Sequence, residues 1–355
     1  MTVKIAIIGD RFMLPEVFQR EIESLIETRL DIRCMSNDWP DEPVEHGYAT
    51  EHATERENEN GMGKLKEYIG DADEVCEFIA DAEILVTHLA PLSDAMLKRL
   101  PDLKLVAVSR GGPVNIDMQA TKNRGITVVN SPGRNASAVA EFTIGAMLAE
   151  TRRIRVGHET LRQGEWRGDL YRADRTGREL KEMTVGLIGY GQIGTRLTSM
   201  LMAFRPRILV ADPYVNLSSE HQAAGVEQVS LDTLLTESDI VSVHARVTEE
   251  TKHIINAESL AKMREGSLLI NTARGPLVDY PALTEALKAG KPAAAMLETF
   301  DIEPPPADME LLSLPNVTLT PHIAGASVYT ITKAATMIAE EIRRYLNNEP
   351  QLNIC

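Results

Sequence analysis

The stretch T-V-G-L-I-G-Y-G-Q-I-G at residues 184–194 decides the fold of this chain. It begins with an apolar run typical of a buried strand, and Gly189, Gly191 and Gly194 then fit the pattern G-x-G-x-x-G. A segment with one apolar face follows, and the next apolar run ends in Asp212, 18 residues beyond Gly194. A strand, a glycine-rich turn, a helix and a distant acidic residue in this order predict a βαβ unit that binds a dinucleotide.

Each part of this motif has a physical task. Gly189 permits a tight turn, Gly191 lets a pyrophosphate approach the backbone, and Gly194 lets the helix pack close to the strand. Asp212 is suited to accept hydrogen bonds from both ribose hydroxyls and would repel the 2′-phosphate of NADP, so we predict NAD as the cofactor. The alternative is that Asp212 only caps the turn before Pro213. The predicted cofactor site consists of Gly189, Gly191, Gln192, Ile193, Gly194, Asp212, His244, Thr272 and Ala273.

Short apolar runs alternate with helix-length segments along nearly the whole chain. Runs of about four to six apolar residues indicate strands buried on both faces, and strands that alternate with helices form parallel sheets. We therefore predict an α/β protein with two doubly wound parallel-sheet domains. The predicted strands lie near Lys4–Ile8, Ile84–Thr87, Leu105–Ser109, Ile126–Asn130, Thr184–Ile188, Arg207–Ala211, Ile240–His244, Ser267–Asn271, Ala293–Leu297 and Val317–Thr320. The predicted helices include Pro15–Glu27, Ser93–Leu100 and Ile331–Leu346.

Length and charge limit the classes of protein to which the chain can belong. Its 355 residues suffice for roughly two domains, and its net charge of −15 disfavours a nucleic acid or an anionic membrane as partner. The apolar runs are far shorter than a membrane span, and the N-terminal residues lead straight into a strand without the pattern of a signal peptide. We expect a cytoplasmic protein with no nucleic-acid or membrane partner.

The three cysteines and one polar region give further predictions. Cys34, Cys76 and Cys355 have no ligand-like spacing, so we predict free thiols and no metal site. The region Trp39–Gly63 is polar and acidic and predicts a surface loop. Two interpretations remain for this loop, a mobile functional segment and a solvated insertion without a function.

Polar residues of catalytic type follow three strands in the second half of the chain. Arg274 comes just after the strand that ends near Asn271, Glu303 comes shortly after the strand that ends near Leu297, and His322 follows the next one. Ligands of an open parallel sheet bind outside the carboxyl ends of its strands. We therefore predict that Arg274, Glu303 and His322 converge at one edge of the sheet.

These three side chains suit the oxidation of a secondary alcohol. A His is the natural base for the hydroxyl proton near neutral pH, and a carboxylate on its other ring nitrogen fixes the tautomer. An Arg can hold a substrate carboxylate and polarise the developing carbonyl. Taken singly, His322 is explained as a polar cap and Arg274 as a surface residue, so the prediction rests on the combination downstream of a dinucleotide motif.

At these motifs the sequence resembles the D-isomer-specific 2-hydroxyacid dehydrogenases, which include phosphoglycerate, glyoxylate/hydroxypyruvate and D-lactate dehydrogenases. The resemblance implies hydride transfer between NAD and the C2 position of a small D-2-hydroxy acid or 2-keto acid. This class includes phosphorylated and sugar-derived acids, and thus a phosphoglycerate dehydrogenase-like activity. In that family the Arg, Glu and His that match Arg274, Glu303 and His322 are catalytic. The matching stretches are G-Y-G-Q-I-G at 189–194, N-T-A-R-G-P-L-V-D at 271–279, E-T-F-D-I-E-P at 298–304, T-P-H-I-A-G-A-S at 320–327 and N-S-P-G-R-N-A-S-A-V-A-E at 130–141.

The fold of that family implies two domains, one of them discontinuous. A flavodoxin-like substrate domain would comprise residues 1–133 and 325–355, and a Rossmann NAD-binding domain would comprise residues 134–324. The family is commonly dimeric through the long helix that starts near Asn135, so we expect a homodimer. Burial of this helix within one subunit is the alternative.

The predicted substrate loop departs from the family pattern. Residues 109–117 read S-R-G-G-P-V-N-I-D, which is shorter than the usual run of Arg-Ala-Gly-x-Gly before Asn-x-Asp. We expect the N–H groups of Gly111 and Gly112 to bind the substrate carboxylate, with Arg110 and Arg274 assisting. Pro113 has no N–H to donate.

Other positions leave the substrate and the function open. Arg172, Arg175 and Arg246 suit either a phosphorylated substrate or a solvated surface, and Glu298 stands where the family commonly has Asp. A formate-type dehydrogenase is one alternative function, disfavoured because formate dehydrogenases resemble this chain but have Gln where it has Glu303. An NAD-sensing, corepressor-like binding protein with little turnover is another, against which the full Arg, Glu and His set argues.

Overall fold

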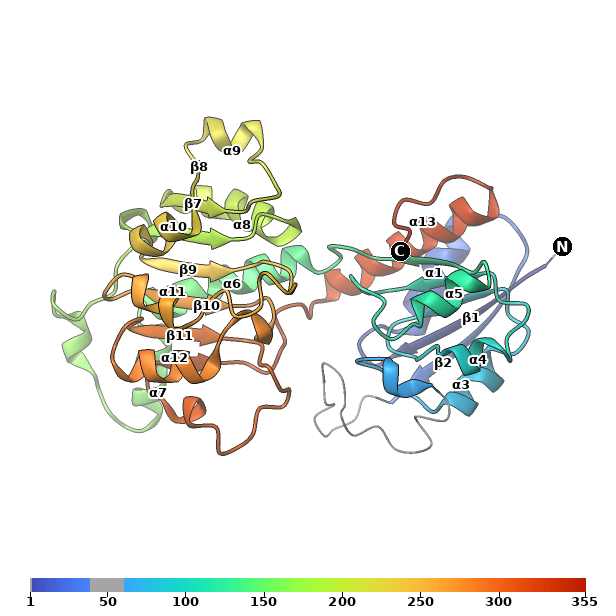
Figure 1. Ribbon diagram of the computed structural model, residues 1–355, viewed down its shortest axis with the longest axis horizontal. Coiled ribbons are helices and arrows are strands. Elements are labelled where there is room, and N and C mark those ends of the chain that lie inside the picture. The colour runs from blue at the N-terminus through green and yellow to red at the C-terminus, as the bar shows by residue number, and fades with distance from the viewer. Residues whose placement is uncertain (1, 39–60) are drawn as a thin grey trace. The chain divides into compact units, whose positions relative to one another are not determined.

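The computed structural model describes residues 2–38 and 61–355. The chain divides into two compact units, Met1–Asn135 with Ala326–Cys355, and Ala136–Gly325. Each unit is built on a parallel sheet with helices on both faces (Figure 1). Of the predicted surface loop, residues 39–60 lie outside the described residues, and Met62–Lys64 form a short 3-10 helix in which Met62 is buried.

The first unit contains a five-stranded parallel sheet in the order β2-β1-β3-β4-β5. This is the flavodoxin-like strand order, so the structure confirms the predicted fold class for this unit. Its strands are β1 (Val3–Asp10), β2 (Leu30–Asn37), β3 (Ile84–Thr87), β4 (Leu105–Val108) and β5 (Thr127–Asn130). Its helices are α1 (Pro15–Leu25), α3 (Ala72–Ile79), α4 (Asp94–Leu97), α5 (Met118–Asn123) and α13 (Val328–Leu346).

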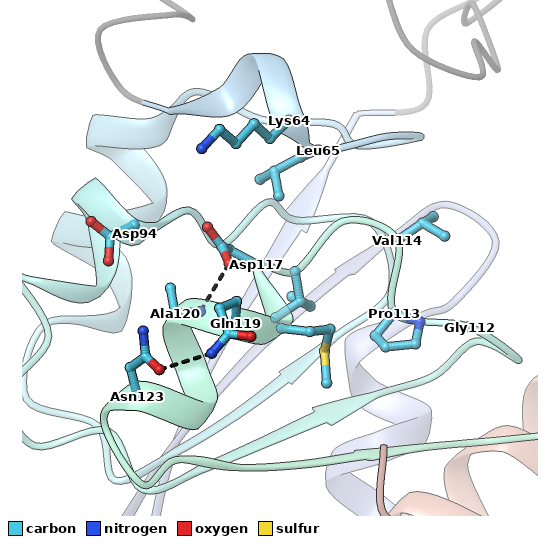
Figure 2. Close-up of a pocket in the computed structure, with 12 residues that line it drawn as sticks. Lys64, Leu65, Asp94, Gly112, Pro113, Val114, Asp117, Gln119, Ala120 and Asn123 are labelled. Carbon is cyan, nitrogen blue, oxygen red and sulfur yellow. Dashed lines mark hydrogen bonds between the residues drawn. The ribbon is translucent and has the colours of Figure 1, made fainter.

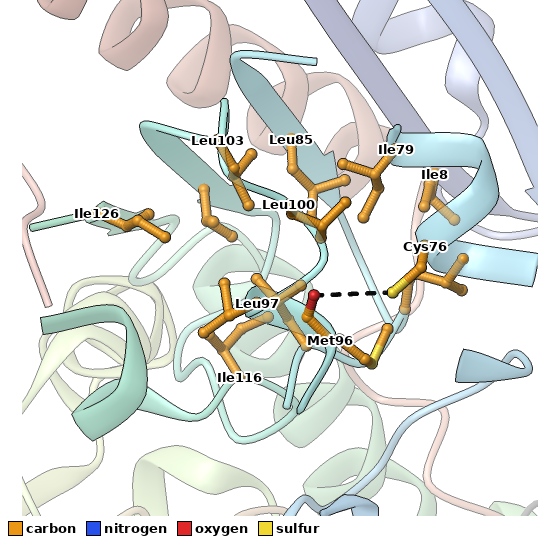
Figure 3. Packing of buried hydrophobic residues seen from close by; sticks show 14 of the residues in the cluster. Ile8, Cys76, Ile79, Leu85, Met96, Leu97, Leu100, Leu103, Ile116 and Ile126 are labelled. Atoms are coloured by element: carbon orange, nitrogen blue, oxygen red, sulfur yellow. Dashed lines mark hydrogen bonds between the residues drawn. The ribbon is translucent and has the colours of Figure 1, made fainter. Parts of the chain in front are cut away.

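Both faces of this sheet are buried. Along β1, Ile5 and Ile7 pack on the side of α1 and α13, whereas Ala6 and Ile8 pack on the side of α3 and α4. Helices α1 and α13 come from opposite ends of the chain and lie side by side (Figure 1). Figure 3 shows the core on the other face, where Leu85 of β3 packs among side chains of α3 and α4. Burial of a Leu or Ile contributes about 1.5–3 kcal/mol relative to exposure, which favours strands that are apolar throughout.

The second unit contains a seven-stranded parallel sheet in the order β12-β11-β10-β9-β6-β7-β8. The direction of strand succession reverses between β6 and β9, where open α/β sheets bind ligands, and β6 carries the glycine motif. This order confirms the Rossmann arrangement. The strands are β6 (Thr184–Ile188), β7 (Arg207–Ala211), β8 (Glu227–Gln228), β9 (Ile240–Val243), β10 (Leu268–Asn271), β11 (Ala294–Leu297) and β12 (Val317–Leu319). The helices are α6 (Ala136–Thr151), α7 (Ile154–Arg162), α8 (Gln192–Leu201), α9 (Ser219–Ala223), α10 (Leu231–Glu237), α11 (Ala257–Lys262) and α12 (Tyr280–Lys288), with 3-10 segments at Gly168–Tyr171, Leu180–Glu182, Met202–Phe204, Gly275–Leu277 and Glu310–Ser313.

Every strand predicted from an apolar run is present, with bounds that differ by at most two residues. The apolar pattern does not predict β2, because this edge strand alternates between half-buried and exposed residues and therefore has no apolar run. Helix α13 begins at Val328, ahead of the predicted start, because the Ser327 side chain accepts a hydrogen bond from the Thr330 N–H and caps the helix there.

Three further expectations concern burial, thiols and membranes. Helix α6 packs against α8 and buries much of its surface within its own unit, which favours the alternative of burial within one subunit. All three cysteines are free. In the described part of the chain, no helix combines the length and apolarity that crossing a membrane requires.

Candidate active site

The glycine motif lies between the carboxyl end of β6 and the first turn of α8. Gly189 has a φ of +100°, which residues with a side chain rarely adopt. A Cβ on Gly194 would lie 2.3 Å from the Gly189 carbonyl oxygen, so only glycine allows the helix to pack this closely. A Cβ on Gly191 would meet nothing within 4 Å, which leaves open space for a pyrophosphate. The first N–H groups of α8, including those of Gln192 and Ile193, have no partner within the helix and suit an anion.

Asp212 follows β7 and is engaged by backbone groups. Its Oδ2 accepts a hydrogen bond from the Tyr190 N–H at 2.8 Å. Its Oδ1 accepts from the N–H groups of Tyr214 at 2.8 Å and Val215 at 3.1 Å, so the turn-capping role is real. A carboxylate offers roughly four acceptor positions, so Asp212 keeps capacity for a ribose hydroxyl while it caps the turn.

His244 follows β9 beside the glycine motif, and its backbone N–H donates to the Ile188 carbonyl at 2.7 Å. The two ring nitrogens differ in their partners. Its Nε2 lies 2.8 Å from the Ser242 hydroxyl, whereas its Nδ1 is buried and has no hydrogen-bond partner among the described residues. Burial lowers the pKa of His244 to about 4, so the ring is neutral at pH 7. This unpaired nitrogen fits a polar group of a bound dinucleotide. Thr272 and Ala273, which follow β10, are buried at the same edge of the sheet.

His322 and Glu303 form a hydrogen-bonded pair. The His322 Nδ1 lies 2.6 Å from Oε2 of the buried Glu303. The other carboxylate oxygen, Oε1, accepts from the Phe300 N–H at 2.8 Å, so the backbone fixes Glu303. His322 has a φ of +52°, a left-handed conformation that costs energy in a residue with a side chain and is concentrated at functional sites.

Neighbouring charges set the protonation of this pair. Burial opposes the charged form of His322, but the hydrogen bond and charge of Glu303, with the charge of Glu298, outweigh it and raise the pKa of His322 above its usual value. Glu298 is buried and accepts from the Ala324 N–H at 2.6 Å. Burial raises the pKa of Glu298 to about 7, so a second group in this site titrates near neutral pH.

Arg274 follows β10 and is exposed. The amide of Asn271 donates to the Arg274 carbonyl at 3.0 Å and fixes the loop. A Cβ on the next residue, Gly275, would lie 2.0 Å from the Phe300 carbonyl carbon, so only glycine lets this loop approach the segment before Glu303. The close approach brings the charge of Arg274 within range of His322, whose pKa it lowers against the larger effect of Glu303.

The predicted substrate loop follows β4 in the first unit. A Cβ on Gly111 or Gly112 would meet nothing within 4 Å, and no hydrogen bond within the described residues uses either N–H group. Arg110 is instead committed to Glu67, with which it forms an ion pair and to whose carbonyl its Nη1 donates at 3.0 Å. The N–H groups of both glycines are therefore accessible to a carboxylate. Arg110 would have to exchange its ion pair with Glu67 for the substrate carboxylate in order to assist as predicted.

A hollow of about 680 Å³ adjoins this loop at Gly112 and Pro113, with α5 on one wall (Figure 2). Its lining includes the carboxylates of Asp94 and Asp117. Lys64 also lines the hollow, and Asp94 forms ion pairs with Lys98 and Arg124. Of the other predicted arginines, Arg172 and Arg175 form exposed ion pairs with neighbouring aspartates, and Arg246 is exposed.

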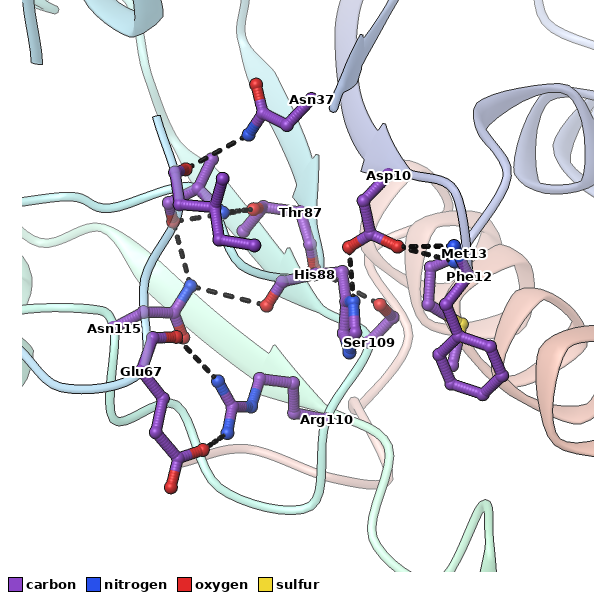
Figure 4. A network of polar contacts seen from close by, with 12 residues as sticks. Asp10, Phe12, Met13, Asn37, Glu67, Thr87, His88, Ser109, Arg110 and Asn115 are labelled. Carbon is purple, nitrogen blue, oxygen red and sulfur yellow. Dashed lines mark hydrogen bonds and ion pairs between the residues drawn. The ribbon is translucent and has the colours of Figure 1, made fainter. Parts of the chain in front are cut away.

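The first unit holds a second imidazole–carboxylate pair, which the sequence motifs do not predict. His88 follows β3, and its Nδ1 lies 2.5 Å from Oδ2 of Asp10, the last residue of β1 (Figure 4). Both are buried. The signal that reveals Arg274 and His322, a polar residue at the end of a buried strand, also marks Asp10 and His88.

Comparison with known proteins identifies the family to which the chain belongs. The NAD binding domain of D-isomer specific 2-hydroxyacid dehydrogenases matches residues 144–324. The hydroxypyruvate reductase of Thermotoga maritima is 39% identical over 277 residues, which cover 77% of this chain and 88% of that protein. This chain belongs to the D-isomer-specific 2-hydroxyacid dehydrogenase family.

As a member of this family, the dehydrogenase uses NAD(H) and acts on the CH–OH group of its donors. The D-3-phosphoglycerate dehydrogenase of Archaeoglobus fulgidus is 35% identical over 307 residues, which cover 86% of this chain and 56% of that protein. The D-lactate dehydrogenase TP0037 of Treponema pallidum, at 23% identity, shares the fold with a TM-score of 0.79 over 99% of both chains. The names of these relatives specify different acids, so the comparison leaves the substrate of this dehydrogenase open.

Proposed function

We propose that this dehydrogenase interconverts a small D-2-hydroxy acid and its 2-keto acid, with Arg274, Glu303 and His322 as its catalytic residues. The second unit would bind NAD(H) and the first unit the acid. The observation that carries the proposal is the hydrogen bond between His322 and Glu303 at the sheet edge that also carries the glycine motif. NAD, when bound, supplies and accepts the hydride.

His322 exchanges the proton with the substrate oxygen. Its Nδ1 faces Glu303, so Nε2 is the nitrogen that gives the proton during reduction and takes it during oxidation. The raised pKa of His322 favours the protonated ring near neutral pH, which suits reduction of a 2-keto acid. Reduction should therefore slow as the pH rises through the pKa of His322.

Arg274 binds the substrate carboxylate and polarises the carbonyl group. A guanidinium has five N–H donors, and the described contacts of this one include a single hydrogen bond, from Nη1 to the Ala273 carbonyl at 2.7 Å. The remaining donors suit the planar carboxylate of the acid. In the first unit, the N–H groups of Gly111 and Gly112 are further donors that suit a carboxylate.

Asp212 should favour NAD over NADP, because its carboxylate would repel the 2′-phosphate. Three backbone N–H groups hold this side chain in place, so it cannot easily turn away from a phosphate. Replacement of Asp212 by Ser should improve NADPH relative to NADH by at least tenfold in kcat/KM. An unchanged ratio would leave Asp212 with the turn-capping role alone.

Steady-state kinetics with a panel of 2-keto acids tests the function. We would measure glyoxylate, pyruvate, hydroxypyruvate and 3-phosphohydroxypyruvate, each with NADH and with NADPH. The proposal predicts turnover of at least one acid with NADH preferred. Tight binding of NADH without turnover of any acid would instead support a sensing protein.

The expected homodimer has a candidate surface at α7 and the residues after it. Helix α7 buries none of its side chains, and Ile154, Leu161, Trp166 and Tyr171 are between 57% and 95% exposed. A second copy of the chain would cover these apolar side chains. Light scattering should give the mass of a dimer for the wild type and of a monomer for the Leu161→Ser/Trp166→Ser variant. A monomeric wild type would refute the dimer.

A further inference from the structure

We propose that Arg134 is an oxyanion-binding residue of the first unit and that it recognises a second anionic group on the substrate. This group would be a carboxylate or a phosphate in addition to the carboxylate that every 2-keto acid carries. The inference rests on the proposed function, because it assigns the second anion to the same substrate. It gives a role to the arginine of the stretch N-S-P-G-R-N-A-S-A-V-A-E at 130–141.

A chain of contacts that starts at Asp10 holds Arg134. Oδ1 of Asp10 accepts from the N–H groups of Phe12 at 2.9 Å and Met13 at 2.7 Å, while Oδ2 lies 2.5 Å from His88 Nδ1 (Figure 4). Burial lowers the pKa of His88 to about 4, so the neutral ring donates from Nδ1 and accepts at Nε2. Nη2 of Arg134 lies 3.4 Å from that Nε2, and its guanidinium carbon lies 6.0 Å from the Phe12 ring centre. These contacts give the guanidinium a defined orientation.

The guanidinium of Arg134 is desolvated but incompletely satisfied. Its Nε and Nη1 are buried and have no hydrogen-bond partner among the residues that the structure describes. Burial and the charge of Arg110 lower the pKa of Arg134 to about 10, so it remains a cation at neutral pH. The imidazole of His88 separates it from Asp10, and the nearby Glu67 is paired with Arg110. A buried cation with unpaired donors is costly, and an oxyanion would supply the missing acceptors with charge-assisted hydrogen bonds.

Arg134 lies where a parallel α/β sheet binds its ligands. Asp10 ends β1 and His88 follows β3. Arg110 follows β4 and Arg134 follows β5, so all four side chains belong to the carboxyl edge of the five-stranded sheet. Ser131, also after β5, has a buried hydroxyl without a partner among the described residues. At this edge, Arg134 and Ser131 therefore both have buried polar atoms that no described residue contacts by a hydrogen bond.

A second oxyanion fits Arg134 better than the common carboxylate does. Within the same unit, the N–H groups of Gly111 and Gly112 already provide donors for the carboxylate that all 2-keto acids share. An additional cation is useful only if the substrate carries an additional negative charge. Dicarboxylic and phosphorylated 2-keto acids both meet this requirement, and the choice between them is an outcome of the kinetic test below.

Titration calorimetry of the full-length protein with inorganic phosphate and with malonate tests the site without turnover. Arg134→Gln should weaken binding of the preferred anion at least tenfold, and Arg134→Lys, which keeps the charge, should lie between Arg134→Gln and the wild type. The control Arg99→Gln removes the same charge from an exposed ion pair with Asp73 and should bind like the wild type. Equal binding by wild type and Arg134→Gln, or no binding of either anion to the wild type, would overturn the proposal. Circular dichroism establishes that each variant is folded.

Kinetics with glyoxylate, 2-oxoglutarate and 3-phosphohydroxypyruvate then identifies the second group. The wild type should prefer one of the two acids that carry a further anion. Arg134→Gln should lower the ratio of kcat/KM for that acid to kcat/KM for glyoxylate at least tenfold, mainly through KM. An equal loss for all three acids would refute the proposal, because Arg134 would then bind the common carboxylate. Turnover of none of these acids and of none in the panel above, together with phosphate binding that depends on Arg134, would refute the proposed function and support the oxyanion site.

His88 and Asp10 are positioning residues in this account, because they act through Arg134. His88→Gln should lower the same ratio in the wild-type background and leave it unchanged in the Arg134→Gln background. A merely structural role would instead lower kcat for every acid and add to the effect of Arg134→Gln. The double-mutant cycle separates these outcomes.

Discussion

Two imidazole–carboxylate pairs of nearly equal length behave in opposite ways in this dehydrogenase. In the second unit, His322 Nδ1 lies 2.6 Å from Glu303, and the pKa of His322 is raised. In the first unit, His88 Nδ1 lies 2.5 Å from Asp10, and the pKa of His88 falls to about 4. A carboxylate at hydrogen-bonding distance therefore does not by itself make a histidine a proton carrier at neutral pH.

Solvent exposure and the charged side chain that lies beside each pair account for the difference in pKa between the two histidines. The side chain of His322 is 32% exposed and has Glu298 as a second carboxylate, whereas that of His88 is 7% exposed and faces Arg134. Burial disfavours the imidazolium in both places, and only at His322 do neighbouring negative charges outweigh it. One pair is thus suited to exchange protons and the other to hold a cation in place.

Replacement of the two histidines should have the most different effects on the rate of the chemical step. His322→Gln removes the proton donor, so kcat/KM for 2-keto acid reduction should fall on the order of 10³-fold. His88→Gln should act mainly on KM. The exposed His158→Gln is the control and should retain wild-type kinetics. A His322→Gln enzyme within tenfold of the wild type would remove the distinction between the pairs.

Arg274→Ala should cost about 10²- to 10³-fold in kcat/KM, because it removes the charge that polarises the substrate carbonyl. Arg274→Lys restores the charge without the planar fork and should recover part of the loss. The matched control is Arg207→Ala, at the amino end of β7, where the arginine forms exposed ion pairs with Glu227 and Glu237. A loss below tenfold for Arg274→Ala would contradict the assignment.

Glu303→Gln should lower the pKa of His322, so that this histidine resembles His88 in being neutral at pH 7. The amide still accepts from the Phe300 N–H, but the negative charge that raises the pKa of His322 is gone and burial prevails. The pKa of His322 should fall, so the loss of reductase activity with rising pH should begin at lower pH, and kcat at pH 7 should fall on the order of 10²-fold. An unshifted pH profile would mean that Glu303 does not control the proton.

The smallest of these effects concerns Glu298. Its pKa of about 7 means that it becomes charged as the pH rises through neutrality, where its charge helps to keep His322 protonated. Glu298→Gln should match the wild type below pH 6 and lose about severalfold in reductase activity at pH 8. Glu285→Gln, on an exposed glutamate of α12, is the control. A constant ratio of the two activities across pH would exclude this role.

The sequence predicts the second unit better than the first. All of its strands except the short, exposed edge strand β8 follow from apolar runs, and Gly189, Gly194 and Gly275 stand where the backbone allows no side chain. Both the sheet and the loops at its edge are therefore visible in the local sequence. A single sequence shows only such local patterns. The convergence of Arg274, Glu303 and His322 is therefore predictable from strand ends alone.

The first unit depends on contacts that no local pattern encodes. The contact between Asp10 and His88 joins residues 78 positions apart, and the contact between His88 and Arg134 joins residues 46 positions apart, so only the folded sheet brings these side chains together. The pairing of Arg110 with Glu67 is likewise a long-range contact, 43 residues apart, and it changes the expected role of Arg110. Edge strand β2 escapes prediction because one side of it faces solvent.

Histidine-selective NMR titration of the full-length dehydrogenase tests the contrast between the two pairs most directly, with His322→Gln and His88→Gln used to assign the signals. The account predicts that His322 titrates above pH 6.5, that this midpoint falls in Glu303→Gln, and that His88 stays neutral down to about pH 4. A His88 that titrates near pH 6.5 together with a His322 that titrates below it would contradict the account.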